Sequence, residues 1–413
     1  MRQDKALEIL KTGANVFLTG EPGAGKTYTI DRFKEWLDKE HRDYAITAST
    51  GIAASHLNGS TIHSFCGLGI RRNLNKEELD GIKRNRWVVE RIRQVKTLVI
   101  DEVSMLDAVS INDVHNVLQA VHNNKKPFGG VQIVFVGDFF QLPPVSKGDE
   151  NRHFAFESHA WQAAAPVVCY LTEQHRQSDP EFLEILTAMR SGGITEVHRE
   201  RLIACQRTEK PDTILYTHNA DVDALNKSEL AKLPGKVHTY MMQSGGNDIL
   251  VQTLKRGCLS PEKLELKKGA VVMMTRNNFN EGYVNGSIGK VKDITKGGDP
   301  IIELLNGKTV RPEMAEWNFT ERKEVKAFIR QLPLRLAWAI TVHKSQGMSL
   351  DNASVDLSKT FEFGQGYVAV SRVRTLQGLH LAGINDMAFA MHPVVVEQDA
   401  IFRAASVEQG KLI

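Results

Sequence analysis

The segment Gly20–Thr27 has the residue types and the spacing of a loop that binds phosphate. It reads GEPGAGKT and fits the pattern GxxxxGK[ST]. The apolar run Asn15–Thr19 precedes it and the helix-like run Tyr28–Leu37 follows it, which is the strand–loop–helix context that this pattern requires. A glycine-rich turn without a ligand is the alternative interpretation, and the context favours a nucleotide site.

Each residue of this loop has a chemical reason to be there. Small residues such as Gly23, Ala24 and Gly25 let backbone N–H groups curl around phosphate oxygens, and the N-terminus of the next helix adds positive potential. Lys26 can reach the β- and γ-phosphates, and the hydroxyl of Thr27 can bind Mg²⁺. The sequence therefore predicts ATP and Mg²⁺ as cofactors.

Two further strand ends carry polar residues suited to hydrolysis. The run Thr97–Ile100 ends in Asp101 and Glu102, where the first carboxylate can hold Mg²⁺ through water and the second can activate the attacking water. Gln141, in the segment Gly137–Val145, can sense the γ-phosphate. A helix N-cap is the alternative for the carboxylates, and a turn stopped by proline is the alternative for the glutamine.

These residues require a buried parallel sheet to position them. Continuous apolar runs alternate with helix-like segments, which is typical of α/β domains with helices on both faces of the sheet. The runs of the first domain are Asn15–Thr19, Tyr44–Ala48, Thr97–Ile100, Val131–Val136 and Val167–Leu171, and those of the second are Thr213–Thr217, Ala353–Leu357 and Gly378–Ala382. We expect a first α/β domain over 1–170 and a second over 171–249 and 333–413.

Two segments depart from this alternation. Residues 250–332 contain short apolar runs separated by Asn-Gly and Gly-Gly pairs, which favour tight hairpins, and we expect a small β-barrel-like insertion there. Residues 63–95 form a predicted excursion from the first domain, whose part Arg71–Arg93 carries eight Lys or Arg against four Asp or Glu. A solvated helix face is the alternative interpretation of that basic patch.

Composition limits the class of protein without identifying a partner. Lys plus Arg number 52 against 49 Asp plus Glu among 413 residues, so a formal charge of +3 excludes a histone-like polycation but allows a locally basic groove. The sequence has no long apolar run, no secretory or transit-like N-terminus and only four scattered cysteines. We therefore expect no membrane partner and a cytoplasmic protein, associated with the nucleoid if it is bacterial.

Three segments together resemble a known enzyme family. Asp101–Asp107, Pro127–Gln132 and Gly137–Val145 resemble the signature of the PIF-type (petite integration frequency) DNA helicases of superfamily 1B, which are related to the RecD and Dda helicases. Further matches are Thr47–Ala54, Thr61–Phe65, Leu171–Gln177, Thr341–Gly347 and Gly364–Arg372. The resemblance implies two RecA-like domains of the P-loop NTPase class, an SH3-like β-barrel insertion in the second and a wedge in the first.

The resemblance also implies roles for residues that spacing alone does not identify. Arg176 and Arg372 correspond to family arginines that reach the γ-phosphate, Gln3 to a glutamine that reads adenine, and Gly347 to a nucleotide contact. His175 departs from the apolar or aromatic residue that the family more often has before the first arginine. The implied DNA-binding residues are Thr50, Gly51, His63, Ser64, Phe65, Asn219, His343, Lys344, Ser345, Gln346 and Tyr367.

The resulting hypothesis is an ATP-dependent DNA helicase that moves 5′→3′ on single-stranded DNA, with domain closure coupled to hydrolysis. We expect it to act as a monomer on single strands and on forked or 5′-tailed duplexes, with guanine-rich folded DNA and RNA–DNA hybrids as further candidate substrates. The polarity is implied by the resemblance alone. A DNA-independent P-loop NTPase or kinase, and a nucleotide-gated DNA-binding protein without unwinding activity, are the alternatives.

Overall fold

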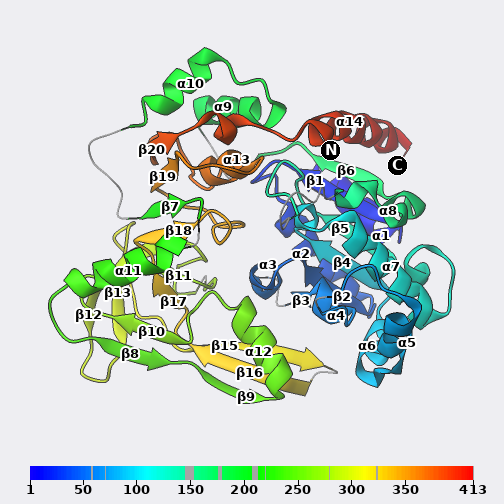
Figure 1. The fold of residues 1–413 in the computed structure, drawn as a ribbon, viewed down its shortest axis with the longest axis horizontal. Coiled ribbons are helices and arrows are strands. Elements are labelled where there is room, and N and C mark those ends of the chain that lie inside the picture. Colours follow the sequence, from blue (N-terminus) through cyan, green and yellow to red (C-terminus); the bar gives the residue numbers. More distant parts are fainter. Residues whose placement is uncertain are drawn as a thin grey trace. The chain divides into compact units, whose positions relative to one another are not determined.

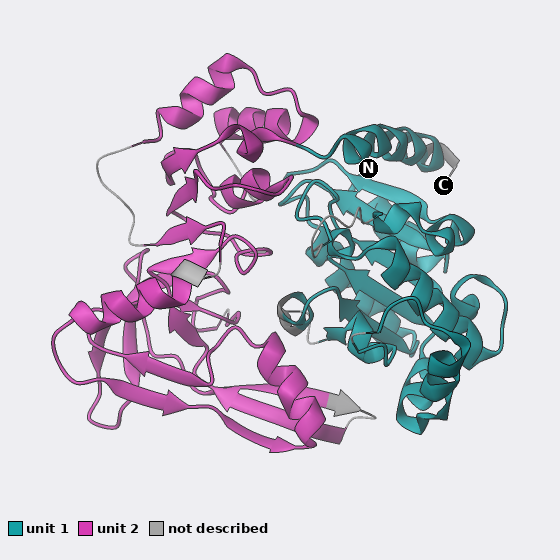
Figure 2. Ribbon diagram, in the orientation of Figure 1, with its two compact units in different colours: residues 1–177, 391–413 teal, residues 178–390 magenta. Residues whose placement is uncertain are grey.

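The chain divides into two compact units (Figure 2), which the computed structural model describes over residues 1–56, 59–69, 71–144, 153–174, 179–206, 213–218, 220–278, 280–321 and 324–412. Unit 1 comprises residues 1–177 and 391–413, and unit 2 comprises residues 178–390. Unit 2 is thus inserted between two parts of unit 1. The sequence instead assigned all of 333–413 to the second domain, because no apolar pattern indicates where a terminal helix packs.

Unit 1 is built on one parallel sheet with the strand order β3-β2-β4-β5-β1-β6 (Figure 1). Its strands are β1 (Val16–Gly20), β2 (Tyr44–Ala48), β3 (Ser60–Thr61), β4 (Thr97–Asp101), β5 (Gln132–Val136) and β6 (Val167–Leu171). Every pairing between them is parallel, so all six carboxyl ends lie at the same edge. This confirms the predicted α/β class, and that edge is where a parallel sheet places its ligand.

The helices of unit 1 begin at local signals in the sequence. Asn75 and Glu78 form a reciprocal capping box at the start of α5, and the Asp107 carboxylate accepts from the Ser110 amide, 2.9 Å away, at the start of α7. The helices are α1 (Gln3–Lys11), α2 (Lys26–Lys39), α3 (Gly51–His56), α4 (Ile62–Phe65), α5 (Lys76–Arg84), α6 (Arg86–Gln94), α7 (Ala108–His122), α8 (His159–Ala164) and α14 (Pro393–Leu412), with single 3₁₀ turns η1 (Val103–Met105), η2 (Pro127–Gly130) and η3 (Ala155–Glu157).

The two faces of this sheet carry different cores. Val16 and Leu18 of β1 pack with apolar residues of α1 and α2. Because side chains alternate along a strand, Phe17 points to the other face. There its ring lies 5.0 Å from Trp161 of α8 and 4.9 Å from Phe402 of α14. The C-terminal helix α14 is therefore part of the core of unit 1.

Helix α14 also binds the edge strand of the sheet. The Val168 amide donates to the side chain of Gln409 over 2.7 Å, and the Tyr170 amide donates to the Ser406 hydroxyl over 3.1 Å. These two side chains occupy N–H groups of β6, which is the edge strand of this sheet among the described residues. The helix thus covers the edge of the sheet as well as one of its faces.

Unit 2 contains a second parallel sheet, of order β18-β7-β19-β20. Its strands are β7 (Ile214–Tyr216), β18 (Ala339–Thr341), β19 (Ala353–Leu357) and β20 (Leu379–Ile384), and its helices are α9 (Pro180–Ser191), α10 (Glu196–Ile203), α11 (Ala220–Lys232), α12 (Asp248–Gly257) and α13 (Gln365–Val370), with the 3₁₀ turn η4 (Asp386–Phe389). The predicted second α/β domain is present. Within the described residues, no helix of either unit is both long and apolar enough to cross a membrane.

Antiparallel strands lie between β7 and β18 in sequence. A five-stranded sheet has the order β14-β13-β12-β11-β17, from β11 (Val271–Met274), β12 (Ile288–Ile294), β13 (Pro300–Leu304), β14 (Thr309–Val310) and β17 (Leu334–Leu336). Two smaller sheets comprise β8 (His238–Met241), β9 (Gln243–Gly246), β10 (Lys263–Leu266), β15 (Ala315–Glu321) and β16 (Glu324–Gln331). Among the described residues, β14 and β17 do not pair with each other, so the SH3-like barrel stays a prediction.

Candidate nucleotide and nucleic-acid site

The phosphate loop connects the end of β1 to the start of α2. The Lys26 ammonium donates to the carbonyl oxygens of Gly20 and Glu21, at 2.7 and 3.2 Å, so its side chain folds back onto the start of the same loop. A Cβ at Gly20 would lie 2.7 Å from the Leu171 carbonyl oxygen, so only glycine lets the loop start this close to β6. Gly25, with a φ of 87°, lies immediately before α2 and turns the chain into it. This is the predicted cradle for phosphate.

Gln3 lies beside this loop. Its side-chain Nε2 donates to the Ala24 carbonyl oxygen over 3.1 Å, which joins the start of α1 to the loop. The structure therefore brings the residue that the resemblance assigned to adenine next to Gly23–Thr27.

The two carboxylates at the end of β4 lie in a strained turn. Glu102 has a left-handed backbone with a φ of 51°, and its amide donates to Asp101 Oδ1 over 2.9 Å. Burial, with the neighbouring charge of Glu102 as a smaller cause, raises the pKa of Asp101 to about 7. Two adjacent acids and the exposed Thr27, with Lys26 as a positive charge near them, form an oxygen donor set that fits a divalent cation.

Gln141 lies in the loop that follows β5 at the same edge of the sheet. Its amide donates to the Asp138 carbonyl oxygen over 3.0 Å, and its side chain is buried. The Gly137 amide donates to the Leu18 carbonyl oxygen over 3.2 Å, which holds the loop against the end of β1. The phosphate loop, the carboxylates and this glutamine therefore follow neighbouring strands β1, β4 and β5.

The segment after β6 continues along the phosphate loop. The Gln174 side chain donates to the Glu21 carboxylate over 2.7 Å, and Glu173 forms an ion pair with Arg2 at 3.2 Å. Gln174 belongs to the match Leu171–Gln177, although its role as a loop contact had no signal in the sequence. Arg176 lies outside the described residues.

The predicted nucleotide residues of unit 2, Gly347 and Arg372, belong to two segments that a backbone hydrogen bond joins. Arg372 is 1 % exposed, and its guanidinium donates to the Val368 carbonyl oxygen over 2.9 Å and to the Ser371 hydroxyl over 2.8 Å. The Leu350 amide donates to the Arg372 carbonyl oxygen over 2.8 Å, which joins α13 to the segment that contains Gly347. These contacts fix the direction of the arginine.

The predicted DNA-binding residues of unit 1 occupy two helix starts after β2 and β3. Thr50 Oγ1 accepts from the Ala53 amide over 3.2 Å, next to Gly51 at the start of α3. His63 and Ser64 are partly buried in α4, and burial lowers the pKa of His63. Phe65 is buried, so its ring belongs to the packing and is not placed to stack on a base.

Arg91 is a functional candidate that the sequence interpretation did not single out. From α6 its guanidinium donates to the carbonyl oxygens of Ser64 and Phe65, at 2.8 and 2.6 Å, and it lies 5.4 Å from the Phe65 ring. The basic excursion is therefore bound directly to the predicted DNA loop. The sequence places Arg91 in the basic patch Arg71–Arg93, but no feature of the sequence distinguishes it from the other basic residues there.

The predicted DNA-binding residues of unit 2 follow β18. His343 and Lys344 are partly exposed, and burial lowers the pKa of both side chains. Ser345 and Gln346 are buried, and the Ser345 hydroxyl donates to the Val342 carbonyl oxygen over 2.8 Å. Tyr367 is 1 % exposed in α13, which leaves its ring unavailable to a base. Asn219 lies outside the described residues.

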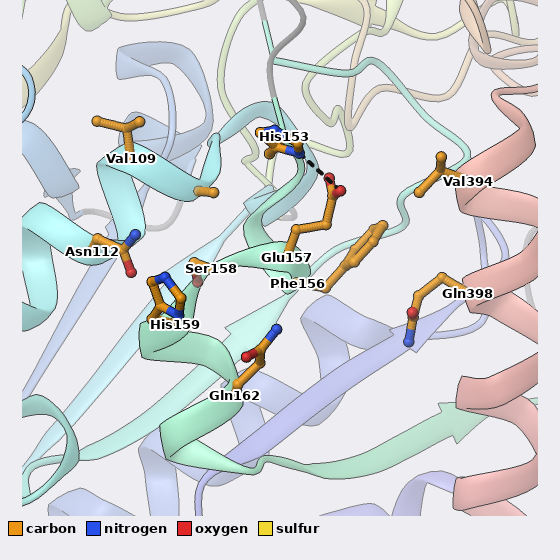
Figure 3. A pocket seen from close by; sticks show the side chains of 11 residues that line it. Val109, Asn112, His153, Phe156, Glu157, Ser158, His159, Gln162, Val394 and Gln398 are labelled. Atoms are coloured by element: carbon orange, nitrogen blue, oxygen red, sulfur yellow. Dashed lines mark hydrogen bonds and ion pairs between the residues drawn. The ribbon is translucent and has the colours of Figure 1, made fainter.

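A separate pocket of about 700 Å³ lies in unit 1, on α7, the segment from His153 to Gln162, and α14 (Figure 3). The side chains of His153 and Glu157, 3.0 Å apart, face Val394 and Gln398 of the terminal helix across it. None of the residues predicted to bind nucleotide or DNA lines this pocket. This pocket therefore lies apart from the residues predicted to carry the chemistry.

Comparison with known proteins agrees with this geometry. The family model for PIF1-like helicases matches residues 3–200, and that for the 2B domain of DNA helicase Pif1 matches residues 250–294. An ATP-dependent DNA helicase Pif1 of Psychrobacter is 41% identical over 99% of this chain and 72% of its own length. The human ATP-dependent DNA helicase PIF1 is 36% identical over 97% of this chain, which spans only 63% of the human protein.

Solved structures show the same similarity. A Bacteroides Pif1 in complex with ADP-AlF4 has a TM-score of 0.86 and 29% identity, covering 97% of this chain and 96% of that one. A Bacteroides Pif1 helicase in complex with ADP-AlF3 and single-stranded DNA has a TM-score of 0.67 and 28% identity over the same shares of the two chains.

Proposed function

This chain belongs to the PIF1-like helicases, a family of ATP-dependent DNA helicases, and from this premise we propose that it uses ATP hydrolysis to move 5′→3′ along single-stranded DNA and to separate duplexes. The observation that carries the proposal is the meeting of the phosphate loop, Asp101, Glu102 and Gln141 at the carboxyl edge of one parallel sheet. The direction of movement rests on the family alone.

The residues of unit 1 divide the chemistry among them. The amides of Gly23–Thr27 would bind the phosphates, and Lys26 would leave its two carbonyl partners for the β- and γ-phosphates. Thr27 and Asp101 would hold Mg²⁺, which neutralises charge on the phosphates when it is bound. Glu102 would accept a proton from the attacking water, and Gln141 would orient that water.

Two arginines complete the proposed active site. Arg176 and Arg372 would stabilise the charge that develops on the transferred phosphoryl oxygens, since a guanidinium keeps its charge and binds two oxygens at once. Loss of such a finger lowers the rate by ~10³–10⁵-fold in related NTPases. The protein would move along DNA because ATP binding favours one arrangement of the two α/β units, and hydrolysis lets the units leave that arrangement.

DNA is the partner that the family assigns to this chain. We propose that the loops after β2, β3 and β18 hold the single strand through small residues, hydroxyls and Lys344, because their amides and short side chains suit phosphate contacts. The basic excursion formed by α5 and α6 would act at a fork. We further propose that the protein acts as a monomer, and that its substrates include 5′-tailed DNA, guanine-rich DNA and RNA–DNA hybrids. We propose that the protein acts in the cytoplasm.

The test measures ATP turnover with and without oligo-dT. We expect DNA to stimulate the rate several-fold, and the stimulation to disappear in Lys26→Ala although the variant still binds DNA. Turnover that DNA leaves unchanged would favour a DNA-independent NTPase. DNA stimulation without strand separation on any tailed duplex would favour a nucleotide-gated DNA-binding protein.

A further inference from the structure

Arg335 and Lys344 are two cations of unit 2 whose charges act on each other, and among the described residues neither forms an ion pair with a carboxylate. Arg335 is the middle residue of the edge strand β17, and Lys344 belongs to the loop after β18. Nε of Arg335 is shielded from solvent and has no hydrogen-bond partner. Among the described residues, no side-chain hydrogen bond or ion pair involves either cationic group.

The strand pattern explains where Arg335 points. Leu334 and Leu336, its neighbours in β17, pack on the apolar core of the five-stranded sheet. Because side chains alternate, Arg335 lies on the opposite face of that sheet, beside its register partner Met273. The segment that follows Lys344 lies against the turn before β12, since a Cβ at Gly286 would lie 3.2 Å from Cβ of Met348.

One carboxylate acts on both cations. The side chain of Asn226 on α11 exchanges two hydrogen bonds with the backbone of Ala339 in β18, at 2.8 and 3.0 Å. Asp223 is one turn earlier on the same face of α11, and its charge raises the pKa of both Arg335 and Lys344. It forms no ion pair with either of them, and it is exposed, so solvent screens it.

The free protein therefore holds a surplus of positive charge that is partly withdrawn from water. Burial is the largest cause that lowers the pKa of both side chains, and the charge of Arg335 lowers the pKa of Lys344 further. A guanidinium stays protonated at neutral pH in spite of this. A desolvated cation without an anion is unfavourable, and a phosphate oxygen between the two groups would relieve both costs.

We propose that Arg335 and Lys344 form one composite site for a backbone phosphate of the bound single strand, and that Asp223 limits its affinity so that the phosphate is released in each cycle. The proposal deepens the DNA-binding function and rests on it. Arg335 comes eight residues before His343 and lies outside the segments that the sequence marked as DNA loops.

The test measures binding of fluorescein-labelled oligo-dT to the full chain by anisotropy at several salt concentrations, without nucleotide. We expect Arg335→Gln to lower affinity ~10-fold, and to reduce the slope of log affinity against log salt by about 0.7, the loss of one phosphate contact on a single strand. Arg335→Lys keeps the charge, so it should restore the slope but only part of the affinity.

Three further variants make the test specific. Arg330→Gln removes the same charge from unit 2, but Arg330 is already neutralised by Glu316 at 2.6 Å, so affinity and slope should match the parent. Lys344→Ala combined with Arg335→Gln should lose less affinity than the two single changes added together, because one phosphate is shared. Asp223→Asn should bind more tightly than the parent.

The inference is overturned if Arg335→Gln and Arg330→Gln have the same affinity and slope while the parent binds DNA. If Arg335→Gln does not fold, Asp223→Asn decides: unchanged affinity in that variant overturns the shared site. A parent that does not bind oligo-dT at all contradicts the proposed function itself, and the composite site with it.

Discussion

Replacing Phe402 with alanine tests whether the terminal helix is part of the core of unit 1. The Phe402 ring is 7 % exposed and meets four aromatic rings, with centroids between 4.9 and 6.3 Å away. Truncation of a buried phenylalanine costs ~3–5 kcal/mol, because apolar area is lost and a cavity remains. At roughly 2–4 °C per kcal/mol for a unit of this size, we expect the melting temperature to fall by roughly 6–20 °C.

The measurement is calorimetry of the full chain, in which the transition of unit 1 is the one that ADP raises, because the ligand binds only the folded state. Val407→Ala is the control: its side chain lies on the same helix but is 61 % exposed, so that transition should move little. Phe402→Leu should fall between the two. A Phe402→Ala transition within 2 °C of the parent would refute the packing of α14 on this sheet.

Other changes should separate the steps of the reaction. Lys26→Ala should abolish ATP turnover but keep DNA binding, as measured by phosphate release and anisotropy; turnover at the parental rate would refute the loop assignment. Glu102→Gln should still bind ATP but hydrolyse it ~10²–10⁴-fold more slowly in single-turnover assays, since it removes a general base. Arg91→Gln should impair unwinding more than Arg84→Gln, which removes the same charge from the excursion at a side chain that donates to the Asp80 carbonyl oxygen of its own helix; equal losses would show that Arg91 does not couple the excursion to the DNA loop.

The sequence predicted the strands, turn and helix that carry the candidate nucleotide residues, because the determinants of these elements are local. A strand, a glycine-rich turn and a helix start are adjacent in the chain, and the strand ends at Asp101 and Gly137 follow directly from the apolar runs before them. Continuous apolar strands imply a parallel sheet, and a parallel sheet brings such ends to one edge. That edge is what the structure contains.

Contacts between residues distant in sequence could not be predicted in the same way. Arg91 and the carbonyl oxygens that it binds are separated by more than one helix, and the partners of α14 lie more than two hundred residues earlier in the chain. Burial separates residue types only on average, so Phe65 and Tyr367 could not be assigned to the interior from the sequence. Arg335 is invisible as a motif, because its proposed role depends on its having no ion-pair partner among the described residues.

The near-neutral charge of the chain is compatible with this distribution. A net charge of +3 describes the whole molecule, whereas phosphate binding depends on where cations stand without acids beside them. Arg335 and Lys344 are the proposed place, whereas Arg330 and Arg201 form ion pairs with glutamates. A modest total charge is also compatible with the proposed release of DNA in each cycle.

The most direct test of helicase action is strand separation of a duplex with a single-stranded tail on one side, followed by fluorescence on addition of ATP. We predict that a duplex with a 5′ tail is separated, that one with a 3′ tail or a blunt end is not, and that Lys26→Ala separates neither. Separation of the 3′-tailed duplex alone would contradict the direction of movement. Failure on all three by a protein that hydrolyses ATP in response to single-stranded DNA would contradict the assignment as a helicase.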